Sequence, residues 1–189
     1  MKIYYSQFGE DKYLDEECNL PKTGIFVDVG AGGIENSNSY FFEQKGWTVL
    51  CIEPDKRHEG LDKRKLVDNS VVGDQDGKVD FVFHRFPQLS GLYHGKVEAT
   101  NLPMYKLDTI LEKYKIDKID ILSIDVEGHE LKVLDGFNID NYKPSYMIIE
   151  HTNQFKGNGE NDICSKLKCF GYQVIYRTQS NLIMKRNLI

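Results

Sequence analysis

Residues 24–55 constrain the fold of this chain more than any other segment. They read GIFVDVGAGGIENSNSYFFEQKGWTVLCIEPD. An apolar run at residues 25–29 leads through a glycine-rich turn into a helical pattern at residues 37–45, and a second apolar run at residues 48–52 ends in an acid. A buried strand joined by glycines to a helix and a second strand is typical of a βαβ unit that binds a nucleotide. The segment therefore predicts an α/β fold with a ligand site at the glycine turn.

The rest of the chain continues this alternation of strands and helices. Further strand-like apolar runs lie at residues 67–72, 119–124 and 146–149, and apolar side chains recur at helical spacing in residues 107–114, 131–137 and 163–170. We expect the five strands to be parallel neighbours in one sheet, because strands that alternate with helices form right-handed crossovers. Tyr172–Arg177 and Asn181–Arg186 are separated only by a short turn, and they predict an antiparallel hairpin at one edge of that sheet.

Length, composition and charge limit the class of protein. A chain of 189 residues with 40% hydrophobic residues can bury the core of one domain, and no linker or repeat divides it, so we expect a single domain over residues 1–189. The formal net charge is −5, and Lys and Arg are scattered along the sequence. This pattern argues against a nucleic-acid partner and favours a small-molecule one.

Membrane and secretory signals are absent from the sequence. No apolar run approaches the roughly 18 residues of a membrane-spanning helix, and the first residues contain no apolar signal segment. The four cysteines form no CxxC pair and are too few for a disulfide scaffold. We therefore expect a soluble, cytoplasmic protein with reduced thiols and no membrane partner.

The glycine turn alone leaves the identity of the nucleotide open. Gly30 and Gly32 fit the first two glycines of the dinucleotide fingerprint GxGxxG, but Glu35 stands where the third glycine belongs. Glu53 ends the second strand and is placed to bind a ribose diol, which both NAD and S-adenosylmethionine contain.

Asp28 favours S-adenosylmethionine over a dinucleotide. Its carboxylate precedes the first glycine by two residues, where a pyrophosphate would meet a like charge and a cationic sulfonium and ammonium would be attracted. The alternative is that Asp28 only forms a hydrogen bond within the turn. We expect Asp28, Gly30, Gly32 and Glu53 to contact the cofactor.

Several motifs together resemble one enzyme family. In chain order they are SQFGED, FVDVGAGG, CIEPD, LDTIL, IDILSIDVEGHELKVLDGF and IIEH. This set resembles the FkbM-type family of S-adenosylmethionine-dependent methyltransferases over nearly the whole chain. The resemblance implies the class I methyltransferase fold, a Rossmann-like three-layer sandwich with a seven-stranded, mostly parallel sheet and a C-terminal antiparallel hairpin. It also implies O-methylation of hydroxyl groups on sugars, glycans or small metabolites.

Two positions depart from the pattern of that family. Ser123 stands where many members have lysine, and Gly33-Ile34-Glu35 replaces a common Asn-x-Gly type of sequence. Both positions belong to the expected cofactor pocket, so its detailed contacts are the part of the site that the resemblance defines least.

Methyl transfer to a hydroxyl needs an aligned acceptor and a group that removes its proton. Asp125 follows the fourth predicted strand and is our first choice for the catalytic region, as a base, as a group that orients the base, or as a ligand to a divalent cation. Glu150 and His151 end the neighbouring strand and could converge on Asp125, and this set of ligands suits Mg²⁺ or Mn²⁺ weakly. His129 is a further catalytic candidate, with a solvated surface histidine as the alternative.

Other candidates surround this centre. Asp74 lies past the third strand and, by the resemblance, could contact the adenine, although DQDG is also a good turn sequence. Gln7 and Asp11 of SQFGED could lie across the cofactor. The aromatic segment at residues 81–96, with His84 and His94, could form the acceptor pocket or simply pack.

Three functions remain under consideration. The leading hypothesis is an S-adenosylmethionine-dependent O-methyltransferase that acts on a small-molecule or glycan acceptor. A nicotinamide-dependent oxidoreductase is disfavoured by Asp28 and Glu35. A non-catalytic module that binds S-adenosylmethionine would be favoured if the Asp125 region were open to solvent and lacked an acceptor pocket.

Overall fold

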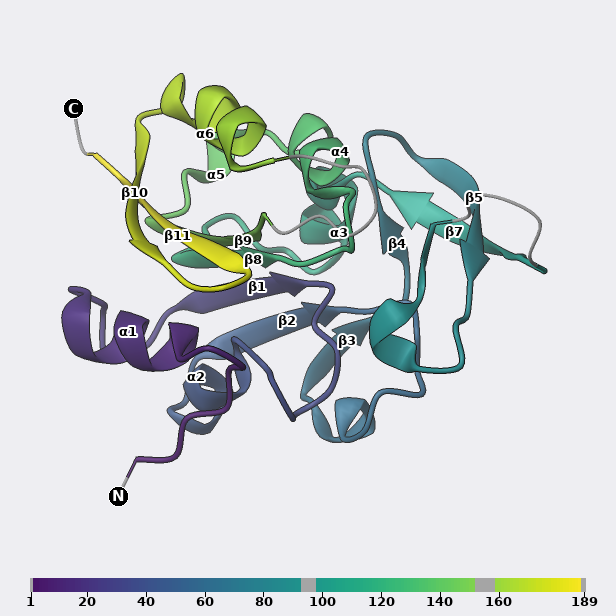
Figure 1. Cartoon of the computed structure of the whole chain (residues 1–189), viewed down its shortest axis with the longest axis horizontal. Coiled ribbons are helices and arrows are strands. Elements are labelled where there is room, and N and C mark those ends of the chain that lie inside the picture. The colour runs from purple at the N-terminus through teal and green to yellow at the C-terminus, as the bar shows by residue number, and fades with distance from the viewer. Residues whose placement is uncertain (1, 93–97, 152–158, 188–189) are drawn as a thin grey trace.

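A computed structural model describes residues 2–92, 98–151 and 159–187. Among these residues the main element is a seven-stranded sheet with the strand order β10-β11-β9-β8-β1-β2-β3 (Figure 1). Its strands are β1 (Ile25–Val29), β2 (Thr48–Ile52), β3 (Leu66–Asp68), β8 (Ile121–Ile124), β9 (Tyr146–Glu150), β10 (Tyr172–Arg177) and β11 (Asn181–Arg186). The first five are parallel to one another, and β11 is antiparallel to both of its neighbours. The predicted mostly parallel sheet with a C-terminal hairpin at one edge is confirmed.

Helices cover both faces of this sheet. One face carries α1 (Glu10–Glu17) and α2 (Tyr40–Gln44), and the other carries α3 (Leu107–Lys113), α4 (Glu130–Asp135), α5 (Ile139–Tyr142) and α6 (Glu160–Lys168). Alternation along β1 explains the two cores: Val27 and Val29 pack with the four helices, whereas Phe26 packs with the first two. The result is a layer of helices on each side of one buried sheet.

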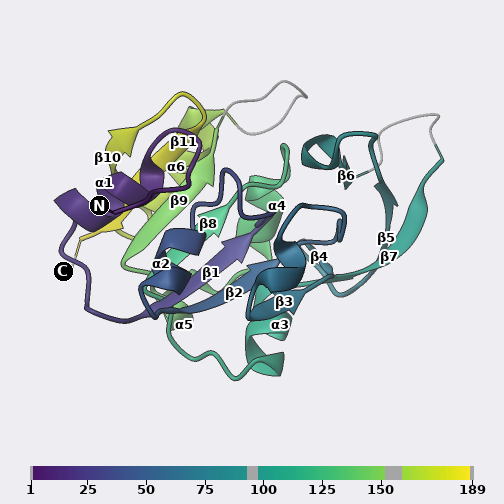
Figure 2. The same cartoon turned by 90° about the horizontal axis from the view of Figure 1, so that it is seen from below.

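A second, four-stranded sheet corrects the expectation of a single sheet. It contains β4 (Val71–Val72), β5 (Gly77–Val82), β6 (Gly91–Leu92) and β7 (Thr100–Tyr105) in the order β4-β7-β5-β6. It lies beside the central sheet, next to the β3 edge (Figures 1 and 2). Val71, Phe81 and Met104 form its small core.

The prediction of one continuous strand at residues 67–72 is therefore wrong, because these residues form parts of two strands. It divides between β3 and β4 because the Asp68 carboxylate accepts a hydrogen bond from the backbone N–H of Ser70 at 2.9 Å, which turns the chain. The side chain of Asn69 also leaves the strand pattern, donating to the backbone oxygen of Glu53 at 2.8 Å. The two halves of the apolar run thus enter different sheets.

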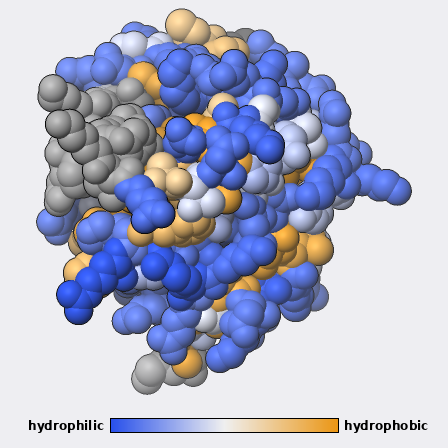
Figure 3. Space-filling model, turned by 90° about the vertical axis from the view of Figure 1, so that its right-hand side faces the viewer, coloured by the Kyte–Doolittle hydropathy of each residue, from blue (hydrophilic) through white to orange (hydrophobic). Residues whose placement is uncertain are grey.

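The helix predicted at residues 37–45 is shorter than expected, since α2 begins at Tyr40. Ser37 and Ser39 precede it and direct their hydroxyls into a buried polar network rather than along a helix. The end of the molecule that carries the second sheet presents a mainly hydrophilic surface with small apolar patches (Figure 3). No helix among the described residues has the length and apolar character needed to cross a membrane.

Candidate active site

A cavity of about 280 Å³ lies at the carboxyl ends of β1, β2 and β8. In an open α/β sheet this is the edge at which ligands bind. The lining residues come from the N-terminal segment, the glycine turn, the loops after β2, β3 and β8, and the segment around β5 and β6; they are Gln7, Val29, Gly30, Ala31, Gly32, Gly33, Glu35, Asn36, Ile52, Glu53, Pro54, His58, Glu59, Ser70, Val71, Val72, Phe81, Pro87, Gln88, Ser90, Gly91, Leu92, Asp125, Val126, Glu127 and His129.

The charge of this lining has one sign. Five acidic residues line the cavity, Glu35, Glu53, Glu59, Asp125 and Glu127, together with His58 and His129, and among the described lining residues there is no Lys or Arg. A cationic ligand would be attracted here, whereas a pyrophosphate would meet like charges without a compensating cation.

The glycine turn is shaped by close approach of neighbouring backbone. Gly30 has φ +76°, and a Cβ on it would lie 1.6 Å from the backbone oxygen of Asp125. A Cβ on Gly33 would lie 2.2 Å from the backbone oxygen of Glu59. Glycine is therefore required at both positions, because the loops after β8 and β2 pack directly against the turn. Gly30 and Gly32, which we predicted to bind the cofactor, both line the cavity.

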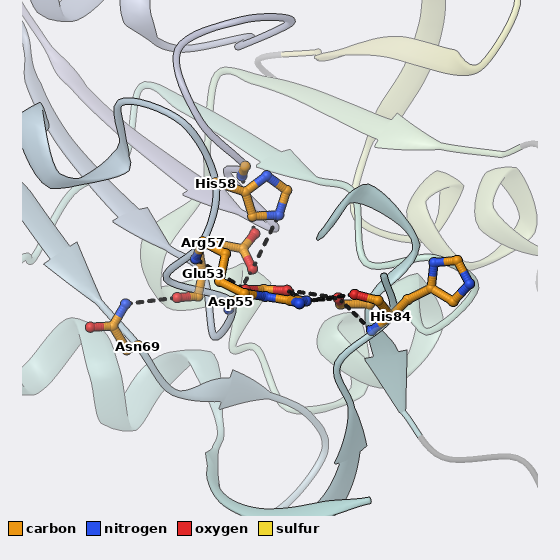
Figure 4. A network of polar contacts seen from close by, with 8 residues as sticks. Glu53, Asp55, Arg57, His58, Asn69 and His84 are labelled. Atoms are coloured by element: carbon orange, nitrogen blue, oxygen red, sulfur yellow. Dashed lines mark hydrogen bonds and ion pairs between the residues drawn. The ribbon is translucent and has the colours of Figure 1, made fainter. Parts of the chain in front are cut away.

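Glu53 lines the cavity, and only 6% of its surface is exposed. Its carboxylate accepts hydrogen bonds from the backbone N–H of Gly32 at 3.1 Å and of Asp55 at 2.8 Å. Burial raises the pKa of Glu53 to about 7, although these two N–H groups oppose the shift. His58 lies beside it, with 3.8 Å between His58 Nε2 and Glu53 Oε1 (Figure 4).

Asp28 lies next to the cavity, but it is not among the residues that line it. It is buried, and it accepts a hydrogen bond from the Ser39 hydroxyl at 2.5 Å. Arg64 donates to the same hydroxyl at 2.7 Å, so the carboxylate is part of a buried network with a cation. Burial raises the pKa of Asp28, opposed by Ser39 and Arg64. This arrangement resembles the alternative in which Asp28 bonds within its own loop.

Asp125 and Glu150 form a carboxyl pair across β8 and β9. A side-chain hydrogen bond joins them. Burial is the main cause that raises the pKa of both groups, and the nearby carboxylates of Glu127 and Glu130 raise both further. Two close carboxyl groups cannot both ionise easily, so the pair retains a proton at pH values where isolated carboxyl groups have lost theirs. Asp125 lines the cavity, whereas Glu150 is not among the lining residues.

This pair should make the protein more stable in mild acid. Raised pKa values mean that the folded state holds protons that the unfolded state releases, so the contribution is present below about pH 4 and declines as the pH rises through the raised values. Glu150→Gln should reduce the difference in unfolding free energy between pH 6 and pH 8 by about 1 kcal/mol, measured by urea denaturation. Glu160→Gln, which alters a carboxyl group whose pKa is lowered by Arg177, should leave that difference unchanged.

The loop after β8 gathers further groups beside Asp125. His129 lines the cavity and stands at the N-cap of α4. Glu127 has φ +55° and also lines the cavity. Glu130 is buried and accepts hydrogen bonds from the backbone N–H of Val126 at 3.2 Å and of Gly128 at 3.0 Å, so it holds this loop in place.

The structure gives no support for the predicted cation. Asp125, Glu150 and His151 do not form a ligand set, since no group of three or more His, Cys, Asp or Glu side chains within the described ranges is arranged to hold a metal ion. His151 is not a lining residue of the cavity, and its Nε2 is buried without a hydrogen-bond partner among the described residues. Asp125 and Glu150 are thus brought together, and His151 is not joined to them by any described contact.

Of the remaining candidate residues, only some line the cavity. Gln7 lines the cavity, whereas Asp11 holds the N-terminal segment by accepting from the backbone N–H of Tyr5 at 2.6 Å. Asp74 lies outside the lining and pairs with Lys132 at 2.8 Å.

The segment at residues 81–96 borders the cavity in part. Phe81, Pro87, Gln88 and residues 90–92 contribute to the lining. His84 contributes its backbone oxygen to a polar network behind the cavity wall (Figure 4). His94 lies outside the described residues.

Sequence reasoning missed His58 and Ser90. His58 follows β2 in a loop without a recognisable motif, and only its place at the carboxyl edge of the sheet could have suggested it. Ser90 lies in the segment that we did consider, but its role depends on a contact with Asp55 that is distant in sequence, at 2.7 Å.

Comparison with known protein families gives one match. The methyltransferase FkbM domain matches residues 26–174, which is most of the chain. No curated protein and no solved structure matches the chain significantly. The match includes β1, the glycine turn, Glu53, Asp125 and Glu150. The protein that contains this acidic cavity therefore belongs to the FkbM methyltransferase family.

Proposed function

We propose that the protein is an S-adenosylmethionine-dependent methyltransferase that methylates a hydroxyl group on a sugar, glycan or small metabolite. The observation that carries this proposal is the acidic cavity beside the glycine turn, in which the described lining has five acidic residues and no Lys or Arg. The arrangement of the sheet, with its antiparallel C-terminal hairpin, supports the class I methyltransferase fold that the family resemblance implies. The four free cysteines fit a reducing cytoplasm, in which we expect the protein to work.

The residues present fit such a cofactor. Glu53 would accept hydrogen bonds from ribose hydroxyls, because its carboxylate faces the cavity at the end of β2. The glycine turn would border the ligand, since Gly30 and Gly32 both line the cavity. Val71, Phe81 and Pro54 supply apolar surface on the neighbouring wall, which suits a flat aromatic base.

Asp125 is the group best placed to act on an acceptor hydroxyl. S-adenosylmethionine, when bound, supplies an electrophilic methyl group. Asp125 would accept the proton of the hydroxyl, and its raised pKa makes it a stronger base than an ordinary carboxylate. Glu150 would orient Asp125 through their shared hydrogen bond. A non-catalytic binding module would be favoured if the Asp125 region were open to solvent. Asp125 is instead partly buried in the cavity, which disfavours that alternative.

Calorimetric titration with S-adenosylhomocysteine and, separately, with NADH tests the proposal. We expect micromolar binding of S-adenosylhomocysteine and no comparable heat with NADH. The reverse preference would establish the nicotinamide alternative and refute the methyltransferase proposal.

Glu53→Ala should weaken the binding of S-adenosylhomocysteine by about 1–3 kcal/mol, the cost of losing a buried charge-assisted hydrogen bond. In the unaltered protein the affinity should rise between pH 6 and pH 8, because Glu53 loses its proton near pH 7 and then accepts more strongly. Glu112→Ala, at an exposed position on α3, is the control and should bind normally. An affinity that is unchanged in Glu53→Ala would remove Glu53 from the cofactor site.

A further inference from the structure

A buried carboxylate behind the cavity wall is held by an arginine and a serine. The Asp55 side chain is only 1% exposed and accepts from Arg57 Nε at 2.8 Å and from Arg57 Nη2 at 2.6 Å. It also accepts from the Ser90 hydroxyl at 2.7 Å. The Arg57 guanidinium thus binds the carboxylate with two parallel hydrogen bonds, which fixes its orientation (Figure 4).

The same guanidinium reaches the segment that precedes Ser90. Arg57 Nη2 donates to the backbone oxygen of His84 at 2.7 Å and to the Ser90 hydroxyl at 3.3 Å. The backbone N–H of His84 donates to Ser90 Oγ at 3.1 Å. The guanidinium also lies 5.5 Å from the centre of the Phe83 ring. Asp55, Arg57 and Ser90, which we call the Asp55 clamp, therefore fasten both ends of residues 84–90 to the loop after β2.

Among the described residues few other contacts hold this segment, apart from a hydrogen bond between the His58 side chain and the backbone of Pro87. Its short helix η2 (Pro87–Leu89) contains no buried residue, and the Phe86 and Leu89 side chains are 56% and 49% exposed. Its described ladder contacts begin only at Gly91, which pairs with Val82. A segment with so little buried apolar surface depends on polar contacts for its position.

One face of this segment nevertheless forms part of the cavity. Pro87, Gln88 and Ser90 line it, whereas Arg57 does not and lies instead in a second groove behind the wall. The clamp is also joined to another lining residue, because the backbone N–H of Asp55 donates to Glu53 Oε1 at 2.8 Å. The loop after β2 thus holds both the wall at residues 84–90 and Glu53, the residue that we propose binds the ribose.

We propose that Arg57 is a positioning residue: through the Asp55 clamp it fixes residues 84–90 as a wall of the cavity, so that ligand affinity depends on a side chain outside the cavity. The part of this inference that concerns affinity rests on the proposed function. Most isolated surface ion pairs contribute little. Arg57 differs because its partner is buried, and its loss would leave the Asp55 carboxylate with fewer donors.

Amide hydrogen exchange and calorimetry of the full chain test the proposal together. In Arg57→Gln, exchange in residues 84–90 should become about tenfold faster, while exchange in β1 and β8 stays unchanged. The dissociation constant for S-adenosylhomocysteine should rise about tenfold, a loss of about 1.4 kcal/mol. Arg57→Lys should recover only part of both effects, since an ammonium cannot reproduce the planar two-bond contact.

Two further variants separate the clamp from general effects of charge or folding. Arg85 belongs to the same segment, but its guanidinium contacts the Phe86 ring and not Asp55. Arg85→Gln should therefore alter neither exchange nor affinity. Ser90→Ala should produce a smaller change than Arg57→Gln. The double variant should show less than the sum of the two changes, because both residues act through one carboxylate.

Unchanged exchange in residues 84–90 of Arg57→Gln would overturn the clamp. Faster exchange without loss of affinity would overturn the positioning role. If the unaltered protein does not bind S-adenosylhomocysteine, the proposed function fails, and the exchange comparison still decides whether Arg57 holds the wall.

Discussion

Gly30→Ala should destabilise the protein by about 3–5 kcal/mol and abolish binding of S-adenosylhomocysteine. The added Cβ would lie 1.6 Å from the backbone oxygen of Asp125, a distance that only movement of the main chain can relieve. That movement would displace either the turn beside Glu53 or the loop that carries Asp125. Urea denaturation and calorimetry measure the two effects separately.

Gly46→Ala is the matched control for this variant. Gly46 also has positive φ, at +94°, but a Cβ there would meet no atom within 4 Å. Its substitution should cost only the conformational penalty of about 1 kcal/mol and leave ligand binding intact. Equal losses in the two variants would show that the contact between Gly30 and Asp125 does not transmit strain, and would contradict the close-approach explanation.

The central sheet was predictable because its signals are local. The run IFVDV in β1 and the run TVLCI in β2 are buried on both faces, so they are apolar almost throughout and stand out from the flanking turns. The hairpin of β10 and β11 was equally visible, since two strand-like segments enclose a short turn. Patterns of this kind determine which residues form strands without any knowledge of distant contacts.

The second sheet was not predictable in the same way. Its strands β4 and β6 contain two residues each, which is too short for a periodic pattern. The division between β3 and β4 depends on single hydrogen bonds from Ser70 and Asn69. The apolar residues at 67–72 therefore gave no sign that the chain passes from one sheet to the other between β3 and β4.

The site likewise combines residues that local patterns indicate with residues whose positions depend on contacts distant in sequence. Glu53, Gly30 and Asp125 line one cavity because strand ends in a parallel sheet meet at one edge, and this rule needs only the order of the elements. Asp28 lies in β1 one residue from Val29, which lines the cavity, and the alternation of a strand turns its side chain toward Ser39 and Arg64 instead. The acidic residues that line the cavity are Glu35, Glu53, Glu59, Asp125 and Glu127, and Asp28 is not one of them.

The loss of turnover in Asp125→Asn should be on the order of 10²–10⁴, the usual span for general acid–base catalysis. Asparagine keeps the shape of the side chain and can still form a hydrogen bond with Glu150, but it cannot take up a proton from a hydroxyl. The affinity for S-adenosylhomocysteine should change little, because Glu53 and the glycine turn are unaltered. Transfer of a radiolabelled methyl group from S-adenosylmethionine to fractionated sugars, glycans and small metabolites provides the assay and identifies the acceptor.

Two comparisons make this result specific to the base. Glu127→Gln removes another carboxyl group of the lining whose pKa is raised by burial, and turnover should fall far less because Asp125 keeps its carboxylate and its hydrogen bond to Glu150. In the unaltered enzyme kcat should rise with pH as Asp125 loses its proton, and this rise should disappear in Asp125→Asn. Activity should survive treatment with EDTA, since the proposed base acts without a cation. If the rise persists in Asp125→Asn and disappears in His129→Gln, the base is His129, which lines the same cavity, and Asp125 is left with a role in orientation alone.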